Sequence, residues 1–223
     1  MSIATTAFGI YASIRIVPIA LLAIFFYSPA GADLVPARSG PDLVESLRAG
    51  GYNIYFRHAQ TDWSQVDHVN TSGDWTSCDP SRMRQLSRDG IRTSKAIGDV
   101  IRSLQLPVGR VLASPYCRTV QTATLMGLGP VETTTDIMNL RVESYFGGRD
   151  AIVRLARARL ARVPRAGTNT VLVAHGNVAR EATPVYPDEA EAVIFRPDGD
   201  GAFVYFARIK ADEWVTLLEA MPQ

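Results

Sequence analysis

The sequence predicts one α/β domain in which β-strands alternate with α-helices. Three observations support this prediction. The chain has 223 residues, which suits a single domain. Hydrophobic residues make up 47% and charged residues 20%, as in ordinary globular proteins with a sizeable core. Short apolar runs also alternate with segments whose apolar residues recur at helical spacing.

The first half of this domain is expected to hold three helices and two strands. Helical spacing begins at Asp42 and ends before Gly50 and Gly51, because glycines commonly terminate helices. Ser87 is suited to cap a second helix. A polar segment between them is typical of a long functional loop. The expected elements are a helix over 42–48, a strand over 52–56, the loop over 59–85, a helix over 87–104, a strand over 108–113 and a helix over 118–126.

The second half is expected to complete the sheet. Residues 170–174 are apolar throughout, which is typical of a strand buried on both faces. Residues 197–201 have the Pro, Asp and Gly composition of a turn and predict a hairpin. The expected elements are an amphipathic helix over 152–163, the strand over 170–174, hairpin strands over 192–196 and 202–209, and a closing helix over 212–218.

Residues 1–32 are expected to be a secretory signal peptide, followed by the domain over 33–223. Arg15 is the only charged residue before Asp33, and twelve apolar residues follow it. Ala30, Gly31 and Ala32 then match the small-residue cleavage pattern. The apolar run is shorter than the roughly 20 residues of a membrane-spanning helix, although an uncleaved anchor is the alternative. Cleavage after Ala32 would make the mature protein secreted or periplasmic, with no membrane attachment.

Charge and composition exclude several classes of partner. The chain has 23 Lys and Arg against 22 Asp and Glu, and a net charge of +1 gives no support for nucleic-acid binding. Three His and two Cys are too few for a Cys-rich zinc module or a disulfide scaffold. In an oxidising compartment Cys78 and Cys117 can form one disulfide, but buried free cysteines are also common, so both states stay open. The oligomeric state is left open too.

Chemically active residues follow three of the predicted strands where each strand ends. Arg57 and His58 follow the first strand, Arg118 lies shortly after the second, and His175 follows the third. In open α/β sheets, ligands bind beyond the carboxyl ends of parallel strands. If the three strands are parallel neighbours, two of the three histidines and two arginines meet in one pocket.

These residue types suit phosphoryl transfer. Arg57 and Arg118 present planar guanidinium groups that bind phosphate oxygens in bidentate fashion. The neutral imidazole of His58 is a competent nucleophile toward phosphorus, and His175 can donate a hydrogen bond where transition-state charge develops. A carboxylic acid must protonate the leaving alkoxide. Each residue taken singly also fits a structural role, but together they predict transfer through a phosphohistidine on His58, with no metal and no cofactor.

Three motifs carry a resemblance to a known family. Residues 57–61 read Arg-His-Ala-Gln-Thr, residues 114–123 read Ser-Pro-Tyr-Cys-Arg-Thr-Val-Gln-Thr-Ala, and residues 175–176 read His-Gly. Together they resemble the histidine phosphatase superfamily, also called phosphoglycerate mutase-like, although Gly-Glu usually stands where Ala-Gln follows the first His. The resemblance extends from about Leu43 to the C-terminus. It implies a three-layer α/β/α sandwich with a mostly parallel central sheet.

The resemblance also implies a role for each motif residue. It makes His58 the phosphorylated nucleophile, while Arg57, Arg118 and His175 hold the phosphate. Ser64 stands where many family members carry an Asn that touches phosphate, and we expect it to be a phosphate ligand with altered substrate contacts.

The general acid has three candidates. In one branch of the family it is a Glu shortly after the second Arg motif, which points to Glu143. In the other branch it directly follows the late His, where Gly176 and Asn177 stand instead. Glu181 and Glu189 stay open as alternatives that could fold back toward the pocket.

The expected function is an exported phosphomonoester hydrolase of the histidine acid phosphatase type, acting on a phosphorylated small molecule. Residues 191–199 are similar to small exported phosphatases rather than to glycolytic mutases. Two alternatives stay open. One is a phosphoramidase or phosphotransferase acting on phosphohistidine in another protein, which would need an open, shallow mouth at the loop over 61–85. The other is a phosphate-binding protein without turnover, which would lack a carboxylate near the leaving group.

Overall fold

The structure, a computed structural model, describes Met1 and residues 39–222. The signal peptide expected over residues 1–32 and its cleavage site therefore lie outside the described residues, Met1 aside. Along the described part of the chain, none of the helices is both long and apolar enough to span a membrane.

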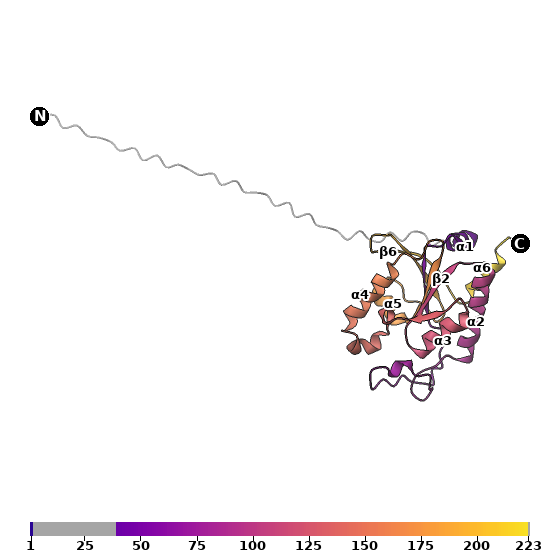
Figure 1. Ribbon diagram of the computed structural model, residues 1–223, viewed down its shortest axis with the longest axis horizontal. Coiled ribbons are helices and arrows are strands. Elements are labelled where there is room, and N and C mark those ends of the chain that lie inside the picture. The colour runs from indigo at the N-terminus through magenta and orange to yellow at the C-terminus, as the bar shows by residue number, and fades with distance from the viewer. Residues whose placement is uncertain (2–38, 223) are drawn as a thin grey trace. The chain divides into compact units, whose positions relative to one another are not determined.

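One six-stranded sheet forms the centre of the domain (Figure 1). The strands are β1 (Asn53–Arg57), β2 (Val108–Ala113), β3 (Val131–Thr133), β4 (Asn169–Ala174), β5 (Ala192–Pro197) and β6 (Phe203–Ile209). They lie in the order β3-β2-β4-β1-β5-β6. The first four in this order run parallel, and β5 and β6 form an antiparallel hairpin against β1. The sheet is mostly parallel, as predicted.

The described residues also form nine helical segments. The α-helices are α1 (Gly40–Ala49), α2 (Arg88–Ser103), α3 (Cys117–Met126), α4 (Arg149–Leu160), α5 (Gly176–Ala182) and α6 (Glu213–Glu219). Three short 3₁₀ helices are η1 (Asp74–Thr76), η2 (Thr135–Ile137) and η3 (Leu140–Tyr145). Ser87 caps α2, because its side chain accepts a hydrogen bond from the Gly90 backbone N–H at 3.0 Å.

Helices cover both faces of the sheet because successive strand residues point to opposite sides. In β1, Ile54 and Phe56 pack into the core formed with α1, α2, α3 and α6, whereas Tyr55 packs into the core formed with α4 and α5. Figure 1 shows α4 and α5 on one side of the sheet and α2, α3 and α6 on the other. The three-layer α/β/α architecture is confirmed.

The strands and helices expected from the sequence are confirmed, with ends shifted by a few residues. β3, α5 and the 3₁₀ helices were not predicted from the sequence. β3 has only three residues, all at least partly exposed at the sheet edge, so it carries no apolar pattern. α5 has only seven residues and begins directly after His175, so its apolar residues were too few to establish a helical period.

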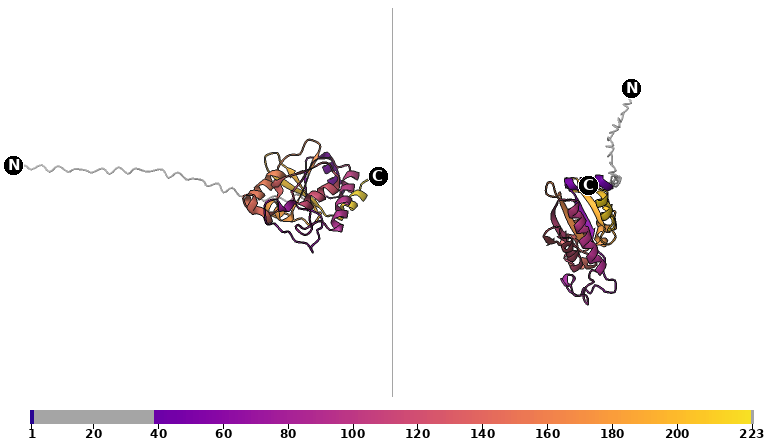
Figure 2. Two further views of the ribbon diagram at one scale, coloured as in Figure 1. Left: turned by 60° about the horizontal axis from the view of Figure 1, so that its bottom comes forward. Right: turned by 90° about the vertical axis from the view of Figure 1, so that its right-hand side faces the viewer.

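The three parallel strands at the centre end together. Arg57 pairs with Ala174 across β1 and β4, and Ala113 pairs with Val173 across β2 and β4. Their carboxyl ends therefore meet at one edge of the sheet. The loop between β1 and α2 lies at this end of the domain, as the two orientations in Figures 1 and 2 agree.

Candidate active site

His58 follows directly on β1 and is buried, with 4% of its surface exposed. Its Nδ1 lies 2.9 Å from the carbonyl oxygen of Ala59. A carbonyl oxygen only accepts hydrogen bonds, so Nδ1 carries the proton and Nε2 keeps its lone pair. Burial lowers the pKa of His58 well below its usual value, and the charge of Arg118 lowers it further. His58 is therefore a neutral imidazole with a free Nε2.

His175 follows β4 and is equally buried. The Tyr55 hydroxyl accepts from its backbone N–H at 3.1 Å and donates to its carbonyl oxygen at 2.8 Å. The Nε2 atom lies 2.9 Å from the Ser114 hydroxyl. Nδ1 is buried and has no hydrogen-bond partner among residues 39–222. Burial, followed by the charge of Arg118, also lowers the pKa of His175, so this ring is neutral too.

The two histidine rings lie close together. Their centroids are 5.7 Å apart, edge to face, and the Tyr116 ring packs 4.7 Å from His175 on another side. Gly176, next to His175, leaves room for the side chains of Tyr186 and Arg57, since a Cβ at that position would lie 3.0 Å from Tyr186 and 3.2 Å from Arg57. His58 and His175 thus lie together beyond the ends of neighbouring strands, as the sequence predicts.

Arg118, in the first turn of α3, is 1% exposed and forms a bidentate ion pair with Asp67. The guanidinium nitrogens donate to the two carboxylate oxygens at 2.9 and 3.0 Å. Burial raises the pKa of Asp67, but Arg118 and Arg84 together outweigh this effect, and the pKa lies below its usual value. Arg118 is thus a fixed cation, and its Nε is buried without a partner in the described structure.

Arg57 is held more loosely at the end of β1. One guanidinium nitrogen donates to the Pro187 carbonyl at 3.2 Å, and the other lies 3.6 Å from Glu189. Glu189 in turn accepts a hydrogen bond from the Thr61 hydroxyl at 3.2 Å. A carboxylate candidate for the general acid therefore touches a predicted phosphate ligand.

Arg84 is a third cation of the site, and the sequence analysis missed it. Its charge acts on both His58 and His175. Its guanidinium stacks 3.9 Å from the ring centroid of Trp63, and its Nε is buried with no partner among the described side chains and backbone. Its only signal in the sequence was a basic residue in a long loop, and such loops often carry functional groups.

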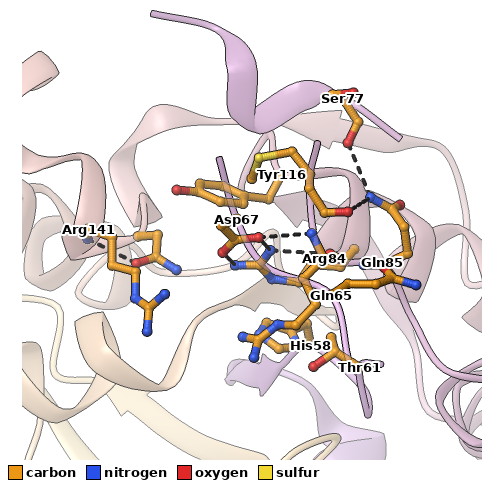
Figure 3. A network of polar contacts seen from close by, with 12 residues as sticks. His58, Thr61, Gln65, Asp67, Ser77, Arg84, Gln85, Tyr116 and Arg141 are labelled. Carbon is orange, nitrogen blue, oxygen red and sulfur yellow. Dashed lines mark hydrogen bonds and ion pairs between the residues drawn. The ribbon is translucent and has the colours of Figure 1, made fainter. Parts of the chain in front are cut away.

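The loop that supplies Asp67 and Arg84 is fastened to the rest of the domain. The Arg84 backbone N–H donates to Asp67 at 3.0 Å, and Asp67 holds Arg118 (Figure 3). Cys78 forms a disulfide with Cys117, the residue next to Arg118. The disulfide that the sequence left open is therefore present. In Figure 3, Asp67 and Arg84 lie above His58 and Thr61, and Arg141 stands to their left.

The arrangement is suited to an oxyanion. Four buried side-chain nitrogens lack a hydrogen-bond partner in the described chain, and three of them belong to charged or catalytic side chains of this site. Burying an unpaired polar group is costly unless a ligand satisfies it. The three at the site are Arg84 Nε, Arg118 Nε and His175 Nδ1. Three arginines also act on His58, whereas two carboxylates contact them. The unpaired donors and the surplus positive charge both fit a phosphoryl group beside His58.

Three other residues expected at the site have hydrogen bonds or ion pairs with partners outside the pair of histidines. Ser64 is exposed, and its hydroxyl donates to Asp62 at 2.7 Å. Glu143 and Glu181 share one partner, Arg149, at 3.3 and 3.1 Å, and line a cavity of about 440 Å³ with it. Within the described chain no hydrogen bond or ion pair joins them to either histidine.

No group of three or more His, Cys, Asp or Glu side chains suited to a metal ion occurs among the described residues. The cationic side chains around His58 suit an anion, since they repel a metal ion.

Family comparison agrees with the geometry. Residues 54–152 match the model of the histidine phosphatase superfamily (branch 1). The match confirms the resemblance that the motifs predict. It contains His58, Arg84, Arg118 and Glu143, whereas His175 lies beyond it. No curated protein sequence matches the chain.

Solved structures of other proteins share the fold. The chain resembles the protein histidine phosphatase SixA complexed with tungstate, at 14% identity and a TM-score of 0.51 over 73% of this chain and 98% of that one. It resembles mycobacterial hydrolase 1 to the same degree, at 14% identity and a TM-score of 0.51 over 73% of this chain and 99% of that one. At this identity the likeness establishes the fold alone.

Proposed function

We propose that this protein is a phosphomonoester hydrolase that works through a phosphohistidine on His58. The observation that carries the proposal is the state of His58, a buried neutral imidazole whose Nδ1 proton is held by the Ala59 carbonyl. This leaves the Nε2 lone pair for attack on phosphorus. The superfamily match over residues 54–152 agrees with this chemistry.

The surrounding donors stabilise the transferred group. Arg57, Arg84 and Arg118 place positive charge beside the phosphoryl oxygens, where negative charge is spread in the transition state. The Nδ1–H of His175 adds a donor if Ser114 donates its hydroxyl proton to Nε2, which fixes that tautomer. As His58 becomes phosphorylated its ring turns cationic, and the Nδ1–H···O bond to Ala59 strengthens.

A small phosphorylated molecule is the substrate class we favour. The loop over 61–85 is tied down by the disulfide and by the Asp67–Arg118 ion pair, which disfavours the open mouth that a phosphohistidine on another protein would need. The disulfide also supports the proposed export, because disulfides persist mainly in oxidising compartments.

The test is hydrolysis of 4-nitrophenyl phosphate by the purified protein and by His58→Ala, with a chelator present. We expect turnover that His58→Ala abolishes, and radiolabelled phosphate trapped on His58 after acid-free quenching. Activity that survives in His58→Ala would assign the nucleophile elsewhere. Absence of turnover with phosphate still bound would favour a binding protein.

A further inference from the structure

The segment over residues 183–191 is hydrogen-bonded to the proposed nucleophile, His58, and to Arg57 before it. The Ala190 backbone N–H donates to the His58 carbonyl oxygen at 3.1 Å, and the Arg57 backbone N–H donates to the Glu191 carbonyl at 3.2 Å. The side chain of Arg57 also reaches the Pro187 carbonyl at 3.2 Å. Residues on both sides of Glu189 therefore form hydrogen bonds with Arg57 or His58.

The residue after Glu189 has a strained backbone conformation. Ala190 is fully buried and has a φ of 63°, in the left-handed region that L-residues other than Gly and Asn rarely adopt. This conformation costs roughly 1–2 kcal/mol and persists only where the surroundings enforce it. The enforcing contacts come from Glu191, which is buried and accepts from Arg208 and from the Asp188 backbone N–H, each at 2.7 Å.

The side chain of Glu189 points toward the phosphate ligands. Its Oε1 accepts from Thr61 at 3.2 Å and lies 3.6 Å from an Arg57 nitrogen, and the side chain is 17% exposed. Its Oε2 has no hydrogen-bond partner in the part of the chain described by the structure, and is free to exchange a proton. Glu143 and Glu181 both form ion pairs with Arg149, and the Oε2 atom of Glu143 is buried and accepts no hydrogen bond in the described chain.

We propose that Glu189 is the general acid of the reaction, an inference that rests on the phosphohistidine mechanism proposed above. In the first step His58 Nε2 bonds to phosphorus while the bond from phosphorus to the ester oxygen breaks. The Oε2 proton of Glu189 passes to that oxygen, and the alcohol leaves. In the second step the Glu189 carboxylate takes a proton from water, whose oxygen bonds to phosphorus as the P–N bond breaks. Inorganic phosphate leaves, and His58 and Glu189 return to their starting states.

Substrate binding changes the surroundings of Glu189. In the free protein an Arg57 nitrogen lies 3.6 Å from the Glu189 carboxylate. A phosphate dianion that binds Arg57 takes over this cation.

The test compares two substrates whose leaving groups differ in basicity. We measure kcat/KM, which reports the step that releases the alcohol, for 4-nitrophenyl phosphate and for a simple alkyl phosphate. Only the alkoxide needs a proton from the enzyme in order to leave. Glu189→Gln is expected to lower kcat/KM for the alkyl phosphate by about 10²–10⁴-fold and to change that for the aryl phosphate far less. Glu189→Asp keeps the carboxyl group and should restore part of the alkyl activity.

The matched control is Glu45→Gln, an exposed carboxylate on α1, which should leave both substrates unaffected. Equal losses for the two substrates in Glu189→Gln would make Glu189 a positioning residue and overturn the proposal. A loss specific to the alkyl phosphate in Glu143→Gln or Glu181→Gln would place the acid there instead. If the unmodified protein hydrolyses neither substrate, the phosphohistidine mechanism itself fails.

Discussion

The two arginines that flank His58 are held in different ways. Arg118 forms a bidentate pair with Asp67, and the two side chains are 2% and 6% exposed. Arg57 donates one hydrogen bond to the Pro187 carbonyl and meets its carboxylate, Glu189, only at 3.6 Å, and the Arg57 and Glu189 side chains are 13% and 17% exposed. Arg118 is therefore fixed in position, whereas Arg57 can change its ion-pair partner.

The difference separates a structural task from a chemical one. Asp67 keeps Arg118 neutralised and fixed while the site is empty, so a buried charge never stands alone. Glu189 neutralises Arg57 only until a phosphate binds Arg57. The proposed proton transfer requires that Glu189 then be released from Arg57. An arginine–carboxylate pair therefore fixes the structure on one side of His58. On the other side such a pair provides the proposed proton donor.

The largest expected effect separates the two arginines by stability. Arg118→Ala leaves Asp67 buried and unpaired, and should lower the free energy of unfolding by about 3–5 kcal/mol. Arg57→Ala removes a weak, partly exposed contact and should cost less than about 1 kcal/mol. Both should lower kcat by about 10²–10³-fold, because each removes a phosphate donor. Urea unfolding and steady-state kinetics measure the two effects, and equal destabilisation by both variants would erase the contrast.

The second-largest expected effect is a loss of stability when the disulfide beside Arg118 is removed. The cysteines are 39 residues apart in sequence, so the chain-entropy estimate for the cross-link is about 4 kcal/mol. Because Cys117 precedes Arg118, reduction should also weaken inhibition by inorganic phosphate. Thermal unfolding and phosphate inhibition, each with and without a dithiol, measure this. The double variant Cys78→Ser/Cys117→Ser is the control, and it should not respond to the dithiol.

The pKa of His58 should show which of the two arginines has the stronger electrostatic effect on this residue. Burial is the main cause of the lowered pKa of His58, and Arg118 acts on it more strongly than Arg57. Arg118→Gln should therefore raise that pKa more than Arg57→Gln does, as measured by NMR titration of the imidazole. A larger rise in Arg57→Gln would reverse the assignment.

The same lowered pKa values link stability to pH. The unfolded chain protonates its histidines near pH 6.5, whereas folded His58 and His175 resist protonation. Above about pH 6.5 both states are neutral and these histidines do not change stability. Below that value the unfolded chain takes up protons that the folded state does not, so the free energy of unfolding declines as the pH falls. The neutral nucleophile should meanwhile keep kcat/KM high into mildly acidic solution.

The half of the site built on strand ends was predictable from the sequence. Arg57, His58, Arg118 and His175 each follow an apolar run, and parallel strands bring such positions to one sheet edge whatever the loops do. Pattern and topology together were sufficient there.

The loop half was not predictable, because long-range pairing decides it. Asp67 meets Arg118 across 51 positions of sequence, and Glu189 meets Thr61 across 128. No local spacing encodes either contact. The family pattern pointed to Glu143, whereas the left-handed backbone at Ala190, next to Glu189, has no sequence signal, since Ala is not a typical residue there.

The smallest expected effect concerns Ser64, which the resemblance makes a phosphate ligand. In the structure its hydroxyl and backbone N–H both bond Asp62 at 2.7 and 3.0 Å, and Ser81 bonds Asp79 in the same way at 2.7 and 2.9 Å. Ser64→Ala and Ser81→Ala should therefore behave alike, each changing kcat/KM by less than about 2-fold, the equivalent of about 0.5 kcal/mol. A ten-fold loss in Ser64→Ala alone would mean that the loop brings Ser64 to the phosphate when substrate binds, and the loose side of the site would then include this loop as well as Arg57.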